Sequence, residues 1–255
     1  MSRQLCITSV DGHTGFLIAE LILTDNKFKK AIGTVTGLTL HPDAPFCKEL
    51  SKLGAKIVPH RPGRLRDMVS SLQEVGADTM CLIPPAHTEK FDITAELIEA
   101  TKKANVPNVC FLSSAGCDLA ERDKQPRLRE FIDLEARFMA SKGDPSTSTG
   151  HSPVIIRCVV KSWLLILSYP GWPSVQLTYQ SKVLHAQSES DESEVQYLLE
   201  YYSLVREGKT NYISTTAFHD VTGGHPQEPP DFFKTYAQEF HAKRGHKKRK
   251  LSADK

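Results

Sequence analysis

Residues 5–23 read LCITSVDGHTGFLIAELIL and contain the turn that decides the fold. The apolar run before the turn predicts a buried strand, and the apolar side chains after it recur at helical spacing. Gly12 and Gly15 stand where the second and third glycines of a G-x-x-G-x-x-G turn would fall, and Ser9 replaces the first. A bare backbone at Gly12 lets a pyrophosphate approach, and a small residue at Gly15 lets the helix pack closely on the strand. The amides at the helix start then face the phosphates.

The chain as far as residue 158 repeats this alternation of strand and helix. Strands of four to ten residues alternate with helices of ten to fifteen, a pattern typical of a parallel sheet with helices on both faces. We therefore expect an α/β fold with a doubly wound parallel sheet, the Rossmann fold. The expected strands are 5–10, 30–39, 55–58, 79–83, 109–112 and 154–158, and the expected helices are 14–23, 44–53, 64–75, 94–104 and 127–140.

After residue 158 the alternation stops, and we divide the chain there. Residues 1–158 form the expected nucleotide-binding domain. Residues 159–242 form a reduced, mostly helical region for a substrate or partner, with amphipathic helices near 195–205 and 232–240. Residues 243–255 are dense in Lys and Arg and cannot bury enough apolar surface to order, so we expect a disordered basic tail.

The composition excludes several classes of protein. A net charge of +2 over the whole chain favours neither nucleic acid nor a membrane surface, apart from the basic tail. There is no signal-peptide pattern and no stretch of roughly 18 apolar residues, so we expect no membrane partner and a cytoplasmic or nuclear location. The 6 cysteines form no CxxC pair, and the 10 histidines lack ligand spacing, so no metal site is expected. Cys6, Cys81, Cys110 and Cys158 lie in apolar runs, which predicts that they are buried.

The tip of the second expected strand bears on the choice of cofactor. NAD-binding proteins place an Asp or Glu there for the ribose, whereas this chain has Leu40 and His41 and no arginine. His41 can donate to a 2′-phosphate, so NADP is favoured slightly over NAD. Pro84 and Pro85 follow the fourth strand and either flank a ribose or simply end the strand. The expected cofactor site comprises Ser9, Asp11, Gly12, His13, Thr14, Gly15, Phe16, Thr39, Leu40, His41, Leu82, Ile83, Pro84, Pro85 and Ser113. The alternative is a tight strand–helix turn that binds nothing.

Three further segments, together with this turn, resemble the NmrA-like family. They are residues 37–42 (GLTLHP), 82–85 (LIPP) and 111–116 (FLSSAG), and the stretch 201–240 is similar to the C-terminal part of fungal members. These are atypical short-chain dehydrogenase/reductase relatives, typified by fungal transcriptional co-regulators that sense nicotinamide dinucleotides. The resemblance implies a Rossmann fold, NAD(P) binding without reliable turnover, and a protein partner bound through the C-terminal region.

The chain departs from that family where catalysis would be expected. Members with a catalytic remnant place a Tyr or His and a Lys in the helix after the Ser-Ser strand. Here that helix has no Tyr-x-x-x-Lys, and Phe131 stands about where the Lys would be. Ser113 and Ser114 either polarise a carbonyl or merely close the strand, and without a Tyr and Lys nearby there is no proton donor, so no catalytic residue is expected. The segment between residue 158 and Lys182 is also shorter than in the family, which makes the C-terminal region a reduced one.

Three functions remain open from the sequence. The first is a dinucleotide-binding redox sensor or transcriptional co-regulator without efficient catalysis. The second is an NADP-dependent oxidoreductase acting on a small carbonyl or quinone. The third is an interaction protein that has lost the cofactor. The missing Tyr-x-x-x-Lys favours the first over the second, and Ser9 in place of glycine keeps the third open.

The basic tail generates a prediction about location. Residues 247–250 (KKRK) fit the short basic runs that nuclear import receptors recognise, although a solvated terminus is the alternative. Deleting residues 243–255 should leave the melting temperature and the dinucleotide affinity unchanged and move a fluorescent fusion towards the cytoplasm. An unchanged distribution would discard the nuclear location, and a large drop in melting temperature would show that the tail packs on the domain.

Overall fold

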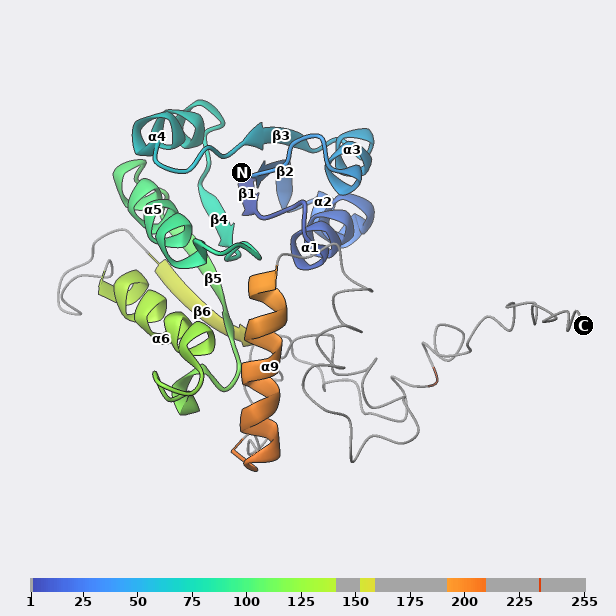
Figure 1. The fold of residues 1–255 in the computed structure, drawn as a ribbon. Coiled ribbons are helices and arrows are strands. Elements are labelled where there is room, and N and C mark those ends of the chain that lie inside the picture. The colour runs from blue at the N-terminus through green and yellow to red at the C-terminus, as the bar shows by residue number, and fades with distance from the viewer. Residues whose placement is uncertain (1, 141–151, 159–191, 210–233, 235–255) are drawn as a thin grey trace, which may run out of the picture. The chain divides into compact units, whose positions relative to one another are not determined.

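The computed structural model describes residues 2–140, 152–158, 192–209 and Lys234 (Figure 1). The strands within these ranges are β1 (Arg3–Thr8), β2 (Ile32–Thr39), β3 (Lys56–Pro59), β4 (Thr79–Leu82), β5 (Asn108–Ser114) and β6 (Ser152–Cys158). The helices are α1 (His13–Thr24), α2 (Asn26–Lys29), α3 (Pro45–Lys52), α4 (Leu65–Glu74), α5 (Lys90–Lys103), the 3-10 turn η1 (Cys117–Leu119), α6 (Pro126–Met139) and α9 (Glu192–Arg206).

The six strands form one parallel sheet in the order β3-β2-β1-β4-β5-β6. Helices α4, α5 and α6 lie side by side on one side of the sheet, and α1 and α3 lie on the other (Figure 1). This confirms the doubly wound parallel fold expected from the sequence. The strand order reverses between β1 and β4, and ligands of such sheets bind at the carboxyl ends of the strands beside that reversal.

The core around β1 follows from its apolar sequence. Leu5 and Ile7 on β1 pack with Phe16 and Ala19 of α1, and α3 adds Cys47 and Leu50. Gly15 makes this close packing possible: a Cβ there would lie 2.8 Å from the carbonyl carbon of Ser9 and 2.9 Å from Cα of Val10. The bare backbone at Gly15 is therefore a packing requirement, as the sequence predicted.

Helix α9 belongs to the same compact unit as the sheet and packs on α6. Its amphipathic face buries Val195, Leu198, Tyr201 and Leu204. Two hydrogen bonds also connect α9 to the start of α6. The Leu128 amide donates to Glu200 Oε2 at 2.8 Å, and Gln125 Nε2 donates to Ser203 Oγ at 2.8 Å. The left-handed Gly208, with φ of 69°, follows the helix where the sequence predicted its end. The segment 159–182, the predicted helix near 232–240 and the basic tail lie outside the described residues.

Two expectations about local structure are wrong. Helix α5 begins at Lys90 rather than at residue 94. Polar residues in its first turn interrupt the apolar spacing from which the helix was predicted, although Lys90 in that turn is buried. Cys158 is exposed, and Cys81 and Cys110 are only half-buried, whereas burial was expected for all three. For Cys158 the cause is the place of β6 at the edge of the sheet, where β5 is its one neighbouring strand within the described residues. The short helix α2 and the turn η1 were not anticipated.

Replacing Gly15 with alanine should destabilise the fold by about 1–3 kcal/mol, because the new methyl group must displace the backbone of Ser9 and Val10. Gly12→Ala is the matched control, since a Cβ at Gly12 meets only the Ser9 carbonyl oxygen, at an ordinary 3.4 Å. Urea unfolding of the two variants checks the difference. Equal free energies of unfolding would show that α1 is free to move away from β1.

Candidate functional site

The turn between β1 and α1 is held by hydrogen bonds to the end of β4. Ser9 adopts the left-handed φ of 53°, as expected for a residue in a glycine position, at a cost of about 1 kcal/mol. Its hydroxyl donates to the carbonyl of Ile83 at 2.8 Å. The Thr8 hydroxyl donates to the same carbonyl at 2.8 Å and accepts from the Ile83 amide at 2.6 Å. The turn is therefore fixed at the point where the strand order reverses.

The start of helix α1 is open to solvent and carries no cap. Gly12 is the N-cap residue, no side chain caps the helix, and its first turn contains no acidic residue. Gly12, His13 and Thr14 are exposed. Because the first amides of a helix lack partners within it and share its positive dipole end, this helix start is a candidate anion site. Gly12 has φ of −93° and room for a Cβ, so the fold itself does not require glycine there.

The other residues of the expected site lie at the turn after β1, at the end of β4 and at the end of β5. Asp11 is half-buried beside the turn, while Phe16 is buried and stacks on Phe46 of α3 with ring centroids 4.5 Å apart. Leu82, Ile83 and Pro85 are buried at the end of β4, and Pro84 is half-buried. Ser113 is buried near the end of β5. The structure therefore brings the residues after β1, β4 and β5 to the same carboxyl edge.

The tip of β2 pairs with the end of β3, a neighbour that the sequence analysis did not consider. Leu40 is half-buried and His41 is exposed, with the His41 amide donating to Thr39 Oγ1 at 2.9 Å. Thr39 pairs with Pro59, and the His60 amide donates to the Thr39 carbonyl at 2.7 Å. The exposed Arg61 directly follows His60, whose amide is bonded to this tip. The basic residues after β3 were the sequence signal for this position. Their nearness to β2 becomes visible only once β2 and β3 are known to pair.

A hydroxyl pair lies at the end of β5. Ser114 is 2% exposed, and its Oγ lies 2.6 Å from the hydroxyl of Tyr197 on α9. Phe111 of β5 pairs with the last residue of β4, and Ser114 lies three residues after Phe111. Strand β5 therefore continues past the end of β4. A tyrosine hydroxyl therefore lies at the end of the Ser-Ser strand, where the sequence analysis found no neighbouring Tyr or Lys. Tyr197 is separated from Ser114 by 83 residues, so no local motif joins them.

A buried lysine completes this group. Lys90, at the start of α5, is 6% exposed, and its ammonium donates to the carbonyl of Arg127 at 2.9 Å and lies 3.3 Å from Glu130 Oε2. The ammonium is also 4.2 Å from the ring centroid of Phe131 and 5.5 Å from that of Tyr197. Burial lowers the pKa of Lys90 from 10.5 to about 8, and the ion pair with Glu130 offsets part of that effect. A cation from α5 thus lies against Phe131, the residue about where the family resemblance would place a lysine on α6.

Two contacts from one arginine hold the loop that leads into α5. Arg127 of α6 donates to the carbonyl of Thr88 at 2.7 Å and to that of His87 at 2.9 Å. Its own carbonyl accepts from Lys90, so loop, α5 and α6 are joined at one point. This arrangement fixes the ammonium of Lys90 relative to Tyr197.

A separate ion pair is structural. Arg157 near the end of β6 donates to both carboxylate oxygens of Glu135 on α6, at 2.9 and 2.7 Å. Burial tends to raise the pKa of Glu135, but the Arg157 guanidinium outweighs it and the pKa is lowered. The pair joins the edge strand to its covering helix.

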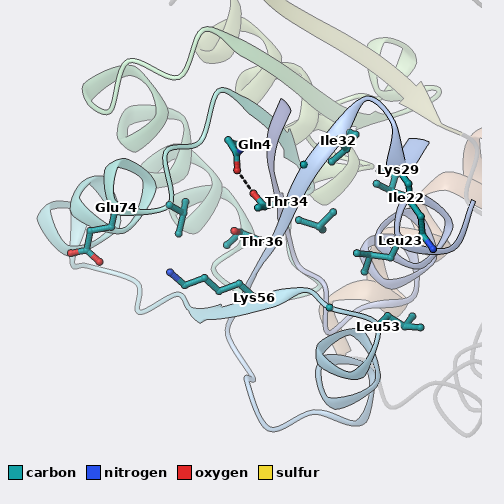
Figure 2. Close-up of a pocket in the computed structure, with 14 residues that line it drawn as sticks. Gln4, Ile22, Leu23, Lys29, Ile32, Thr34, Thr36, Leu53, Lys56 and Glu74 are labelled. Carbon is teal, nitrogen blue, oxygen red and sulfur yellow. Dashed lines mark hydrogen bonds between the residues drawn. The ribbon is translucent and has the colours of Figure 1, made fainter. Parts of the chain in front are cut away.

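A hollow in the surface lies at the other end of the strands. It has a volume of about 520 Å³ and is lined by residues at the amino ends of β1, β2 and β3, among them Gln4, Thr34 and Lys56 (Figure 2). Figure 2 shows the hydrogen bond from the Thr34 hydroxyl to Gln4 that crosses part of it. Because the anion site and the hydroxyl pair lie at the carboxyl ends, this hollow belongs to neither.

Two further classes of site were searched for within the described ranges. Among those residues no group of three or more His, Cys, Asp or Glu is arranged to hold a metal ion. No helix in the same ranges is long and apolar enough to cross a membrane.

The strand order, the turn and the open helix start together define a Rossmann-type α/β fold. No protein-family model and no curated protein sequence matches the chain. Solved structures do match. Triphenylmethane reductase from Citrobacter sp., complexed with NADP(H), has a TM-score of 0.62 at 11% identity and covers 91% of this chain and 99% of its own. The NADPH-dependent quinone oxidoreductase QOR2 from Escherichia coli, complexed with NADPH, has a TM-score of 0.62 at 13% identity, with coverage of 92% and 99%. At these identities the likeness establishes the fold.

The burial of Lys90 predicts a pH dependence of stability. The unfolded chain keeps the lysine proton up to about pH 10.5, whereas the folded protein releases it near pH 8. Between these values the unfolded state binds more protons, so the free energy of unfolding should rise with pH. Comparing urea unfolding of the wild type and Lys90→Met at about pH 7 and about pH 9.5 isolates this contribution. The wild type should gain stability relative to the variant, and parallel pH curves would show that Lys90 titrates as a solvated lysine.

Proposed function

We propose that this protein binds NADP(H) at the carboxyl edge of its sheet and acts as an NADP-dependent oxidoreductase on a small carbonyl or quinone. The observation that carries the proposal is the exposed, uncapped start of α1, fixed at the strand-order reversal by the Ser9 and Thr8 bonds to Ile83. An anion-binding helix start at this place is what a dinucleotide pyrophosphate requires. Both reductases compared above were solved with NADP(H), which supports the same ligand here.

The two halves of the sheet offer places for the two nucleotides. The adenosine half belongs over β1 to β3, with its ribose at the tip of β2, and the nicotinamide half belongs over β4 and β5. Pro84 and Ser113 then border the nicotinamide side. Gly12 presents bare backbone to the pyrophosphate, and since the fold does not need glycine there, ligand approach accounts for it.

The tip of β2 supports NADP over NAD. The residues that directly follow β2 are Leu40 and His41, rather than an Asp or Glu that could accept from a ribose 2′-hydroxyl, whereas the exposed His41 and Arg61 can both donate to a 2′-phosphate. A planar guanidinium binds phosphate in bidentate fashion, so Arg61 is the stronger of the two donors.

A second candidate function is a redox-sensing or transcriptional co-regulator of the NmrA type. The lack of Tyr-x-x-x-Lys on α6 favours it, because cofactor would then bind without a proton donor from that helix. Its protein partner would use the region after residue 158. An interaction protein that has lost the cofactor remains as the outcome if no dinucleotide binds.

The pyrophosphate site can be tested by Gly12→Val. The branched side chain occupies the space where phosphates meet the backbone, so NADPH affinity should fall at least tenfold, about 1.4 kcal/mol. Thermal stability should change little, because Gly12 has an extended φ that valine adopts. Titration of NADPH fluorescence measures the affinity. A wild type that shows no thermal shift with any dinucleotide would overturn cofactor binding and leave the interaction protein.

The phosphate preference can be tested by Arg61→Gln. Loss of a charged contact to the 2′-phosphate should weaken NADPH about tenfold, and NADH, which lacks that phosphate, should be unaffected. Arg66→Gln is the matched control, an exposed arginine on α4 further from the β2 tip in sequence. Equal losses for both cofactors would place Arg61 outside the phosphate site.

Oxidation of NADPH in the presence of a panel of quinones and aldehydes separates the two candidate functions. The oxidoreductase predicts saturable turnover that depends on the acceptor. NADPH binding without any turnover across the panel would favour the co-regulator.

A further inference from the structure

We propose that Tyr197 donates the proton during carbonyl reduction, with Ser114 and Lys90 as its positioning residues. This inference rests on the proposed function, and it assigns a role to a helix from the part of the chain that follows β6. The three residues come from α9, β5 and α5, so the site is complete only when α9 packs on the sheet domain.

The position of the hydroxyl pair supports the assignment. Ser114 is the last residue of β5, in the half of the sheet that takes the nicotinamide under the proposed function. It lies three residues beyond Phe111, which pairs with the last residue of β4. Its buried Oγ, 2.6 Å from the Tyr197 hydroxyl, fixes the phenol at this edge. Tyr197 itself is half-buried, unlike the fully buried Ser114.

The hydroxyl contact is not what holds α9 in place. The helix is already joined to α6 by Glu200 with the Leu128 amide and by Ser203 with Gln125. Its apolar face supplies further attachment through buried leucines and Tyr201. Docking of α9 therefore does not depend on the Ser114 contact alone.

The chemical step balances with one hydride and one proton. The carbonyl carbon accepts a hydride from C4 of the reduced nicotinamide, and the π electrons of the C=O bond move to oxygen. That oxygen takes the proton of the Tyr197 hydroxyl, giving an alcohol and a phenolate. The phenolate then regains a proton from water. The carbonyl compound is reduced and the nicotinamide is oxidised to its cationic form.

Lys90 lies where it can stabilise the phenolate. Its ammonium lies 5.5 Å from the Tyr197 ring centroid, inside a buried setting where charges interact strongly. The charged groups that act on this ammonium are Glu130 and Arg127 from α6 and Glu200 from α9. Because burial brings the pKa of Lys90 to about 8, its positive charge is lost in the mildly alkaline range. Aldehyde reduction should therefore decline as the pH rises through about 8.

Tyr197→Phe is the direct test, and Tyr202→Phe is its matched control. Tyr202 lies on the same helix, and its hydroxyl is buried without a hydrogen-bond partner among the described residues. NADPH affinity, followed by fluorescence, should stay within about twofold of the wild type in both variants. Aldehyde reduction should fall by about 100-fold in Tyr197→Phe, the lower range of general acid catalysis. The control should retain the wild-type rate.

Two further readouts separate chemistry from structure. Isobutyramide, a carbonyl compound that cannot be reduced, should bind the NADPH complex about tenfold more weakly in Tyr197→Phe, because its oxygen loses a hydroxyl donor. Quinone reduction should fall much less, since hydride transfer gives an aromatic hydroquinone anion that water can protonate. Lys90→Gln should lower the rate with aldehyde and abolish the decline near pH 8.

The outcomes distinguish this inference from the function on which it rests. A wild type that binds no NADPH overturns the proposed function. A wild type that binds NADPH but reduces no aldehyde, or a Tyr197→Phe variant with undiminished aldehyde reduction and isobutyramide affinity, overturns the role of Tyr197 and leaves cofactor binding intact. A pH profile unchanged by Lys90→Gln overturns the role of Lys90.

Discussion

The hydrogen bonds from Thr8 and Ser9 to the backbone of Ile83 are the constraint on which the rest of the site depends. They hold the first strand–helix turn against β4 and keep a non-glycine residue in a left-handed conformation that an isolated chain would avoid. With the turn fixed, Gly15 brings α1 onto the backbone of Ser9. The amide end of α1 is then aimed at the carboxyl edge of the sheet. A helix start that was free to move would offer an anion a much weaker site.

The opposite end of the proposed site depends on contacts between helices. Lys90 on α5 joins the carbonyl of Arg127 on α6 and faces Tyr197 on α9. The cost of burying its ammonium is offset only in part by a carbonyl, a carboxylate and two aromatic rings. This group lies beside the end of β5, whereas the anion site lies beside the end of β1. The two sites are thus separated along the sheet in the way that the two halves of a dinucleotide are.

The fold and the first turn could be predicted from the sequence because their signals are local. Each signal involves residues that are close in sequence. These signals are the spacing of apolar residues in each strand and helix, the pair Gly12 and Gly15, and Ser9 in a glycine position. The pairing of Ser114 with Tyr197 could not be predicted, since it joins positions 83 residues apart through the docking of an amphipathic helix. Arg61 was missed for a similar reason: strand pairing of β3 with β2 brings it to the tip. Cys158 was placed wrongly because an apolar run does not reveal that its strand is at the edge of the sheet.

Isothermal titration of the full chain with NADPH, NADP and NADH tests the central claim most directly. The account predicts saturable binding of one dinucleotide per chain, with NADPH and NADP bound more tightly than NADH because of the cationic tip of β2. Absence of binding heat for all three cofactors, at several temperatures, would contradict it. The turn fixed by Ser9 and Thr8 would then be a structural feature of a fold that has no dinucleotide ligand.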